Sequence, residues 1–566
     1  MKSFIKSKKT LAVLLIIGTL SAIGFTRGKD FKLAQSLDIY YTLFRELNLF
    51  YVDKPNPEKL VKTSIESMLE SLDPYTKYIP EKDMDDFKFM TTGNYGGIGA
   101  LIQKEGEYAI ISQPYKDFPA DKAGLKVADK ILEIDGESIK GWNLKKISDN
   151  LKGIPETKVT LLIERPGMDK PIEKSVQRKK VHINSVPYYA MMDKEHGTGY
   201  IRLSKFTKDC SQEVKAAYKD LKQKNDLNAI VLDLRSNPGG LLIEAVDVAN
   251  IFIPKGKKIV STKGRVEKWN HTYKTESEPL DTEIPLVVLV NRASASASEI
   301  VSGAVQDLDR GVVLGERTFG KGLVQTTRPL SYNGQLKVTT AKYYIPSGRC
   351  IQAKDYSNRN EDGSVGEIPD TLIQQFKTAN GRKVFDGGGI RPDVEKESGT
   401  MSKVEISLLS NQLIFDYVTQ FVLDHDSIPP IDKYEVSDQS YADFREFLES
   451  REWEYTTRSE KKLDKLIETA KKEKYYTRAK ETIEELKEKL SNNKEKDLQE
   501  FKTEIKQLLE EEIASRYYYK AGSIEANLED DQQVKEALEL LTKDNLYNDI
   551  LSGAIPRDNI KKVNEE

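Results

Sequence analysis

This chain of 566 residues has only two cysteines, Cys210 and Cys350, so no disulfide framework can replace a hydrophobic core. Histidine is also scarce, and none of the four lies in a cluster with metal-ligand spacing: His182, His196, His271 and His425. The formal net charge of −3 gives no reason to expect nucleic acid or an anionic surface as a partner. We therefore expect no metal, no cofactor and no nucleic-acid partner.

The beginning of the chain has the composition of a targeting segment. "MKSFIKSKKT" supplies four lysines, and "LAVLLIIGTLSAIGF" follows as an apolar run. The run is shorter than the roughly 20 residues of a spanning helix, and Ala22 and Gly24 are small enough for a cleavage site. Residues 1–25 are predicted to be a signal peptide or membrane anchor, with a buried core helix as the alternative. The rest of the chain would then work outside the cytoplasm, in the periplasm, secreted, or held at the inner membrane.

The length and the change of pattern along the chain predict about three or four folded parts. Helical spacing comes first, then short β-like runs with glycines and two helical pieces, then alternating strands and helices, and finally a charged helical stretch. We expect five segments: the targeting segment 1–25, a helical region 26–85, a small β-barrel domain 86–180, an α/β core 181–395 and a charged helical domain 396–566. The last is expected to be a solvated domain or an oligomerisation arm.

The motif "NRASASASEI" follows the apolar strand "LVVLV" and begins a helix. A serine in such a turn holds its hydroxyl where free backbone N–H groups and the helix dipole favour negative charge. That is what a tetrahedral oxyanion requires, although an ordinary helix cap would also place serine there. The chain has no G-x-S-x-G motif. Glu299, in the first helical turn, is interpreted as structural.

The stretch "GERTFGKGLVQ" begins like a phosphate-binding loop, G-x-x-x-x-G-K. The Ser or Thr of that motif is replaced by Gly322, and a strand rather than a helix follows, so we do not expect a nucleotide site. Lys321 could instead serve as a general base, which requires desolvation to lower a lysine pKa toward neutrality. On an extended chain Lys321 and Gln325 face the same side. A surface lysine and glutamine are the alternative.

Two glycine-rich stretches complete the set of candidate sites. "LRSNPGGLL" joins a buried strand to a helix, and Gly240 could donate a backbone N–H to an oxyanion there. "NYGGIGALI" could hold a peptide's terminal carboxylate and pair with its backbone. Each stretch could equally be an ordinary turn.

Together these motifs resemble the carboxy-terminal processing proteases, also called tail-specific proteases. "YGGIGALI" with "AGLKVADKILEIDG" is similar to a PDZ domain, and "LRSNPGGLL", "NRASASASEI" and "GERTFGKGLVQ" occur in the family's order. The resemblance covers about residues 31–395. It implies an α/β core of the crotonase and Clp-peptidase type, with an inserted PDZ domain and helical regions at both ends.

The resemblance also implies roles for individual residues. Ser296 would be the nucleophile, Lys321 the base and Gln325 the residue that orients them, with oxyanion donors at Ala297 and Gly240. The PDZ residues expected to bind a peptide terminus are Gly96, Gly97, Ile98, Gly99 and Leu101. Substrates would be extracytoplasmic proteins with flexible, apolar C-termini, and the helical regions could bind another copy or an adaptor.

Three other functions compete with this interpretation. A silent PDZ scaffold would more typically have lost Ser296 or Lys321, both of which this chain retains. For a Ser/Lys acylase of the S-x-x-K type, the motif does occur at Ser459–Lys462, but inside a charged helical run. The third, a nucleotide binder, is disfavoured by Gly322 and by the targeting segment.

Overall fold

The computed structural model describes residues 31–555, apart from 361, 491–492 and 544. Internal contacts divide the chain into a small and a large compact unit. The small unit contains the residues up to Tyr78, with 327–330 and 335–338. Its helices cover 31–50 and α2 (Pro57–Glu70), as the helical spacing there predicts, and "DKPNPEK" separates them. The expected targeting segment lies outside the described residues.

The centre of the large unit is a six-stranded sheet with the order β10-β11-β12-β15-β16-β23. All neighbours pair in parallel except β10 with β11. Every residue of the two central strands, β12 and β15, is buried, which explains their continuous apolar sequence. The strands are β10 (Tyr188–Asp193), β11 (Thr198–Arg202), β12 (Ala229–Asp233), β15 (Leu286–Val290), β16 (Val312–Gly315) and β23 (Val394–Glu395).

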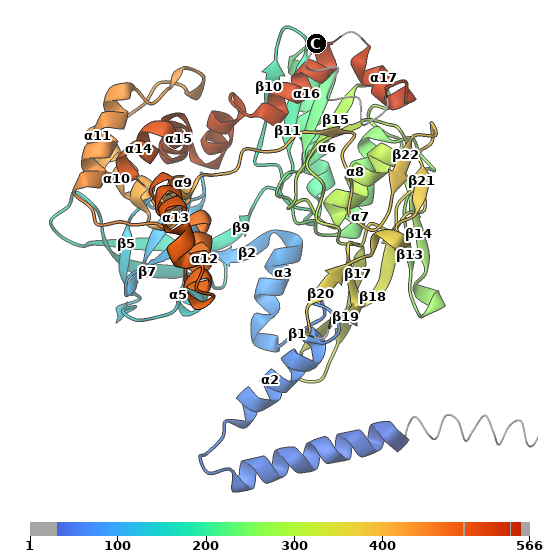
Figure 1. The fold of residues 1–566 in the computed structure, drawn as a ribbon, viewed down its shortest axis with the longest axis horizontal. Coiled ribbons are helices and arrows are strands. Elements are labelled where there is room, and N and C mark those ends of the chain that lie inside the picture. Colours follow the sequence, from blue (N-terminus) through green and yellow to red (C-terminus); the bar gives the residue numbers. More distant parts are fainter. Residues whose placement is uncertain (1–30, 361, 491–492, 544, 556–566) are drawn as a thin grey trace, which may run out of the picture. The chain divides into compact units, whose positions relative to one another are not determined.

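Helices cover both faces of this sheet, as the alternating pattern predicts for an α/β layer fold (Figure 1). One face forms a core with α6 (Cys210–Lys224), α7 (Leu242–Phe252) and α8 (Ala297–Asp307). The other face packs against α16 (Gln532–Thr542) and α17 (Leu546–Ser552). The last two helices belong to the segment predicted to be a separate charged domain. Here their apolar stripe, including Val534, Ala537 and Leu540, is buried against the sheet.

A second, antiparallel sheet lies beside this core and follows the Lys321 motif. Strand β18 pairs with β17 on one side and with β13 on the other, and β13 pairs with β14. Two short ribbons, β19 with β20 and β21 with β22, complete this part. The strands are β13 (Lys258–Lys263), β14 (His271–Lys274), β17 (Leu323–Pro329), β18 (Gln335–Tyr344), β19 (Lys354–Arg359), β20 (Val365–Glu367), β21 (Gln375–Lys377) and β22 (Lys383–Phe385).

The predicted small β-domain is an antiparallel sheet with the order β3-β4-β5-β7-β8, and β6 adds to β5. Strand β3 is at its edge. The two predicted helical pieces are α4 (Pro119–Lys122) and α5 (Leu144–Leu151), and a ribbon of β2 with β9 joins the domain to the core. The strands are β2 (Asn94–Gly97), β3 (Ala100–Glu105), β4 (Tyr108–Pro114), β5 (Lys130–Ile134), β6 (Glu137–Ser138), β7 (Lys158–Glu164), β8 (Ile172–Gln177) and β9 (Lys179–His182), with α3 (Met84–Thr92) before β2.

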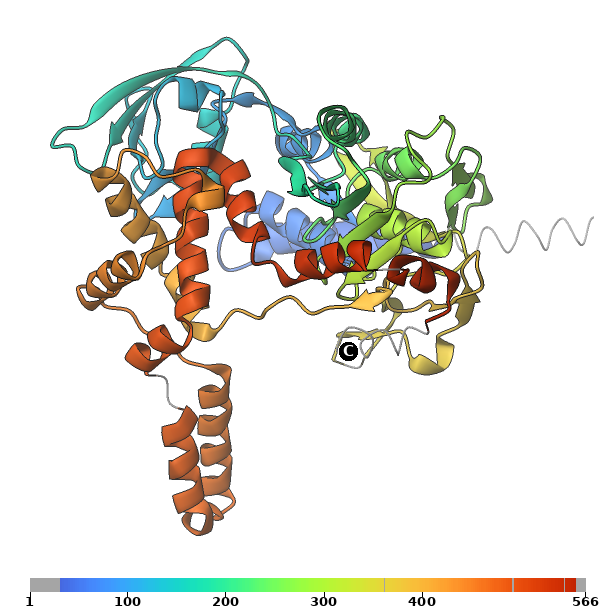
Figure 2. The ribbon, with the colours of Figure 1, turned by 90° about the horizontal axis from the view of Figure 1, so that it is seen from above.

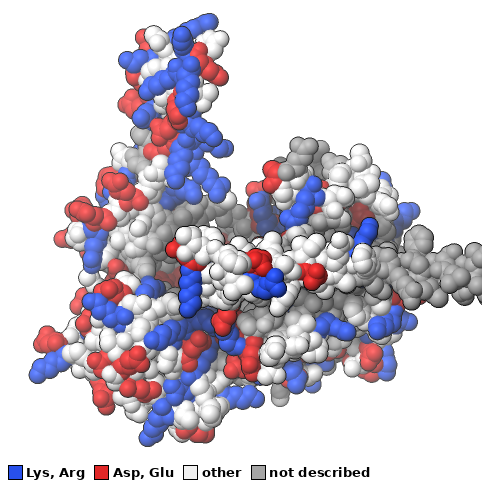
Figure 3. Space-filling view, turned by 90° about the horizontal axis from the view of Figure 1, so that it is seen from below, with Lys and Arg blue, Asp and Glu red and all other residues white. Residues whose placement is uncertain are grey.

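Between β23 and α16 the chain forms a helical bundle with its own apolar core, which we call the helical region (residues 403–528). Two of its helices form a hairpin that stands away from the others (Figure 2). Acidic and basic side chains lie interspersed on the arm and body visible in Figure 3, as expected of a solvated surface. The helices are α9 (Lys403–Ser410), α10 (Leu413–Asp424), α11 (Asp438–Glu449), the hairpin α12 (Arg458–Lys472) and α13 (Tyr476–Leu490), α14 (Lys494–Glu500) and α15 (Lys502–Leu528).

Among the described residues, no helix has both the length and the apolar character needed to cross a bilayer. Cys210 and Cys350 are both free thiols. Burial raises the pKa of Cys210 above its usual value, as expected of an unreactive buried thiol.

Candidate active site

We call residues 291–296, between β15 and α8, the serine turn. Its two serines, Ser294 and Ser296, and Ser298 in the first turn of α8 have different surroundings. Ser294 and Ser298 are fully buried. Their hydroxyls donate to the carbonyls of Leu234 and Asn237, each at 2.8 Å. Ser296 is partly exposed, and its hydroxyl donates to neither carbonyl. Among the three, Ser296 is therefore the serine that solvent or a substrate can reach.

The backbone of Ser296 adopts φ 57° and ψ −109°, a conformation that a non-glycine residue rarely has. Such strain persists only where the surroundings impose it, and it is concentrated at functional sites. Ser296 is the N-cap of α8 and Ala297 is its first residue. Because a first-turn N–H has no acceptor within its own helix, the Ala297 N–H is available to a developing negative charge.

A second loop lies against the serine turn. It follows β12 and contains the Pro-Gly-Gly stretch in which an oxyanion donor is expected. We call it the glycine loop (residues 234–240). The Ala295 N–H donates to Asn237 O at 3.0 Å. A Cβ on Gly239 would lie 2.8 Å from Ala297 N and 2.9 Å from Ser296 Cβ, and Gly239 has φ +93°. Only glycine allows this approach, so Gly239 packs directly against the serine turn.

The predicted oxyanion donor, Gly240, has a different orientation. Phe206 N donates to Gly239 O at 3.2 Å, and Leu241 N donates to Phe206 O at 2.8 Å. In this parallel bridge the N–H of Gly240 points away from Phe206. Its direction is compatible with the predicted role, while Gly239 N donates to the side chain of Asn237 at 2.9 Å.

Glu299 connects the serine turn with the lysine motif. Its carboxylate is fully buried. One oxygen, Oε2, accepts from the N–H of Ser296 at 2.8 Å and from the N–H of Lys321 at 2.9 Å. Since both nitrogens bond the same oxygen, they lie at most about 6 Å apart. The structure thus brings together the two residues predicted to form the dyad.

The other oxygen of Glu299 is also fully used. Oε1 accepts from the Thr318 hydroxyl at 2.6 Å and from the Gly320 N–H at 2.7 Å. Burial pushes the pKa of Glu299 above its ordinary value. The four donors oppose that shift, because each of them stabilises the ionised carboxylate. The sequence interpretation of Glu299 as a first-turn residue is confirmed by its bond to Ser296 N, but it missed the connection to Lys321.

Two glycines hold the lysine motif close to a neighbouring segment. A Cβ on Gly320 would lie 2.4 Å from Ala353 Cβ, and one on Gly322 would lie 2.7 Å from Gln352 N. Gly322, which stands where a phosphate-binding loop has Ser or Thr, therefore serves close packing. Lys321 is partly buried between them, and β17 begins two residues later, so the helix of a phosphate-binding loop is absent here.

Tyr343, which the sequence did not single out, lies beneath both predicted dyad residues. It is almost fully buried on β18. Its hydroxyl is 3.2 Å from Ser296 O and also contacts Lys321 O. Its N–H donates to Gly322 O at 3.0 Å. No local pattern marks this tyrosine, because its position depends on the pairing of distant strands.

Gln325 lies on β17, after Lys321, as predicted. Its side-chain amide donates to the Thr339 hydroxyl at 3.2 Å and to Leu323 O at 3.3 Å. These bonds fix the amide against β18, and neither of them reaches Ser296 or Lys321.

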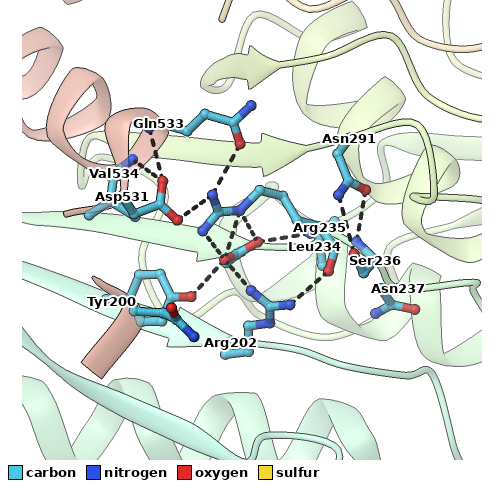
Figure 4. Close-up of polar contacts among 12 residues, drawn as sticks. Tyr200, Arg202, Leu234, Arg235, Ser236, Asn237, Asn291, Asp531, Gln533 and Val534 are labelled. Carbon is cyan, nitrogen blue, oxygen red and sulfur yellow. Dashed lines mark hydrogen bonds and ion pairs between the residues drawn. The ribbon is translucent and has the colours of Figure 1, made fainter. Parts of the chain in front are cut away.

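The base of the glycine loop is held by a buried charge network, shown in Figure 4. Asp233, at the end of β12, is fully buried and accepts from Tyr200 at 2.6 Å and from Arg202 at 2.7 Å. Arg235 also donates to it, at 2.7 Å from Nη2. Burial would raise the pKa of Asp233, but the charges of Arg235 and Arg202 outweigh burial and lower it to about 2.

The β-domain has a pocket of about 470 Å³ between β3 and α5. Of the five residues predicted to bind a peptide terminus, Ile98 and Leu101 line this pocket. Tyr95 also lines it; burial raises the pKa of its hydroxyl, and the nearby backbone N–H groups of Gly99 and Ala100 oppose that shift.

The other two predicted glycines pack at the base of the domain. Gly96 and Gly97 pair with β9 through Lys180 and Lys179. A Cβ on Gly96 would lie 2.2 Å from Gly153 O. Their lack of a side chain therefore serves close packing, whereas Ile98 and Leu101, which follow them, line the pocket.

Comparisons with known proteins agree with this arrangement. Residues 197–358 match the model of peptidase family S41, residues 110–165 match the PDZ domain, and residues 404–541 match the C-terminal helical domain of a probable PDZ-protease. A carboxy-terminal-processing protease of Bartonella bacilliformis is 39% identical over 336 residues, which cover 59% of this chain and 74% of that protein. A probable CtpA-like serine protease of Staphylococcus aureus is 39% identical over 55% of this chain and 62% of its own length.

Among solved structures, the photosystem II D1 C-terminal processing protease is 27% identical and covers 63% of this chain and 92% of its own, with a TM-score of 0.34. The α/β core, the inserted PDZ domain and the helical ends are the expected architecture. The chain therefore belongs to the carboxy-terminal processing proteases, the PDZ-containing serine peptidases of family S41.

Proposed function

We propose that this protein is a serine endopeptidase with a Ser/Lys dyad that cleaves extracytoplasmic proteins after capturing their flexible, apolar C-termini. Ser296 attacks the scissile carbonyl, and Lys321 accepts its proton and later donates one to the leaving amine. The N–H groups of Ala297 and Gly240 hold the oxyanion, and Gln325 orients the dyad. Water then hydrolyses the acyl-enzyme and frees Ser296.

The observation that carries this proposal is the shared Glu299 oxygen. It bonds the backbone N–H groups of both Ser296 and Lys321, so a single buried side chain holds the two residues close together, as a nucleophile and its base require. Of the three serines of this motif only Ser296 is accessible, and it lies at a helix N-terminus, where an oxyanion is stabilised.

The capture of C-termini is supported by the PDZ pocket. Strand β3 is an edge strand, so a peptide can pair with it. The backbone N–H groups of Gly99 and Ala100 act on Tyr95, which lines the pocket, and a terminal carboxylate bound there would accept from such groups. Its lining is rich in apolar side chains, including Ile98, Leu101 and Leu144, which favours apolar terminal residues. The basic and apolar start of the chain supports a location outside the cytoplasm.

The dyad is tested with the purified full-length chain and a fluorogenic peptide. Ser296→Ala and Lys321→Ala should each lower kcat by at least about 10³-fold while the proteins stay folded. A fluorophosphonate should label the parent at Ser296. Labelling of another serine, or full activity of Ser296→Ala, would remove the assignment.

Capture is tested with a flexible reporter protein that ends in apolar residues. Leu101→Glu should raise KM for this reporter by about tenfold or more and leave hydrolysis of a short peptide unchanged. Met168 is a matched control, because it is an equally exposed apolar residue of the PDZ domain that does not line the pocket. Equal effects of Leu101→Glu and Met168→Glu would contradict capture at this pocket. Binding of the reporter without cleavage by the parent chain would favour a PDZ scaffold.

A further inference from the structure

Arg235 connects the glycine loop with the distant end of the chain. Its Nη1 lies 2.6 Å from Asp531 Oδ2 and donates to Gln533 Oε1 at 3.0 Å, both at the start of α16 (Figure 4). Its other nitrogens bond Asp233. The guanidinium thus lies between the last residue of β12 and a helix almost 300 residues further along, and it is 8% exposed.

Asp531 completes the charge balance of this network. Asp233 alone faces two arginines, Arg202 and Arg235, in a buried cluster. Without a second carboxylate one positive charge would be buried without a counterion, which is costly. Asp531 supplies that carboxylate, and its other oxygen caps α16 by accepting from the N–H groups of Gln533 and Val534.

Gln533 joins the segments that lead into and out of the helical region to the same arginine. Its side chain is 1% exposed, accepts from Arg235 and donates to Lys396 O at 2.7 Å. Lys396 is the first residue after β23, and its ammonium lies 2.9 Å from Glu536 on α16. The chain therefore leaves the core and returns to it at one place, and Arg235 lies there.

A displaced Arg235 would displace the glycine loop. Arg202 donates to Arg235 O at 3.1 Å, and Ser236 N donates to the Asn291 side chain at 2.8 Å. Ser236 has φ 58°, so this part of the loop is held in a strained conformation. The same loop carries Gly239 against the serine turn.

We propose that Asp531 and Gln533 are positioning residues for the glycine loop, acting through Arg235, so that docking of α16 on the core is needed for full peptidase activity. The proposal rests on the proposed function, because it assumes that the glycine loop holds the oxyanion. It gives α16 a part in the reaction, in addition to its part in the fold.

The test uses Asp531→Asn in the full-length chain, because asparagine keeps the helix cap and removes the charge that faces Arg235. Asp530→Asn is the matched control, since it removes one negative charge at the adjacent position, where the side chain pairs with Lys535. Hydrolysis of a short fluorogenic peptide, the rate of fluorophosphonate labelling and the melting temperature are measured for both.

We expect Asp531→Asn to lower kcat and the labelling rate by about tenfold at unchanged KM, less than the 10²–10³-fold of losing an oxyanion donor. Asp530→Asn should match the parent. Equal kcat for the two variants would overturn the proposal, and so would a loss of kcat fully explained by a smaller folded fraction. An inactive, unlabelled parent would instead contradict the proposed function.

Arg235→Lys separates an effect through Arg235 from a general one. If Asp531 acts through Arg235, Asp531→Asn should lower kcat by less than about twofold once Arg235→Lys is present. If the kcat losses of the two substitutions multiply instead, Asp531 does not act through Arg235, and the proposed path is overturned. Gln533→Ala should resemble Asp531→Asn in kcat, and an unchanged kcat there would remove Gln533 from the proposal.

Discussion

The serine turn and the glycine loop follow neighbouring parallel strands and contact each other, yet they are held in different ways. The serine turn is fixed by residues within or close to its own motif, chiefly Ser294 and Glu299. The glycine loop is fixed at its base by Arg235, whose partners Asp531 and Gln533 come from the end of the chain. One half of the candidate site is therefore specified locally and the other half by the tertiary fold.

The largest expected effect comes from removing the local anchor. Glu299→Ala leaves four buried donors without their acceptor, so we expect a loss of about 3–5 kcal/mol in the free energy of unfolding, together with loss of activity. Urea denaturation and peptide hydrolysis measure both. Glu278→Ala is the control, because Glu278 pairs with Lys255 at 3.2 Å and both side chains are mostly exposed, so its loss should cost about 1 kcal/mol or less. Equal costs would show that Glu299 is no special anchor.

The contact between the two loops is tested at Gly239. An alanine there would place its Cβ within 3 Å of Ala297 N and Ser296 Cβ, so kcat should fall by about 10²-fold or more. Gly256 also has a left-handed backbone, but no atom lies within 4 Å of its Cβ position. Gly256→Ala should therefore show a similar strain of about 1 kcal/mol with normal activity. A normal kcat for Gly239→Ala would separate the glycine loop from catalysis.

We expect the two buried serines, Ser294 and Ser298, to contribute more to the stability of the fold than to catalysis. Ser294→Ala and Ser298→Ala each remove one hydrogen bond between the serine turn or α8 and the glycine loop, and each should cost about 1 kcal/mol in unfolding free energy. Peptide hydrolysis should stay within about tenfold of the parent. A complete loss of hydrolysis in either well-folded variant would move the nucleophile away from Ser296.

The smallest effect is expected outside both loops. The Gln325 amide bonds Thr339 rather than the predicted dyad, so Gln325→Ala should lower kcat by less than about tenfold. Steady-state kinetics with the fluorogenic peptide measures this. A loss greater than about 10²-fold would mean that the amide turns toward the reacting atoms when substrate binds.

Local patterns in the sequence predict the parts of the site that local contacts build. The apolar runs of β12 and β15, the glycines beside Lys321 and the cap formed by Glu299 are all visible as short-range signals. The roles of Asp531, Gln533 and Tyr343 are not, because distant strands and helices bring them to the site. The placement of α16 was missed for a related reason: its charged face resembles that of the helical region, and only packing shows which sheet its apolar face covers.

The junction at Lys396 and Gln533 also affects how the sequence of this protein can change during evolution. Since the chain leaves and re-enters the core at adjacent points, the helices between them form a loop that is closed at its base. The entropic cost of closing a loop rises only slowly with the length of the loop. Helices α12 and α13 could therefore lengthen, shorten or change their surface at little cost to the peptidase core. We expect sequence variation to concentrate in that arm, and the few residues at the junction to vary together with Arg235.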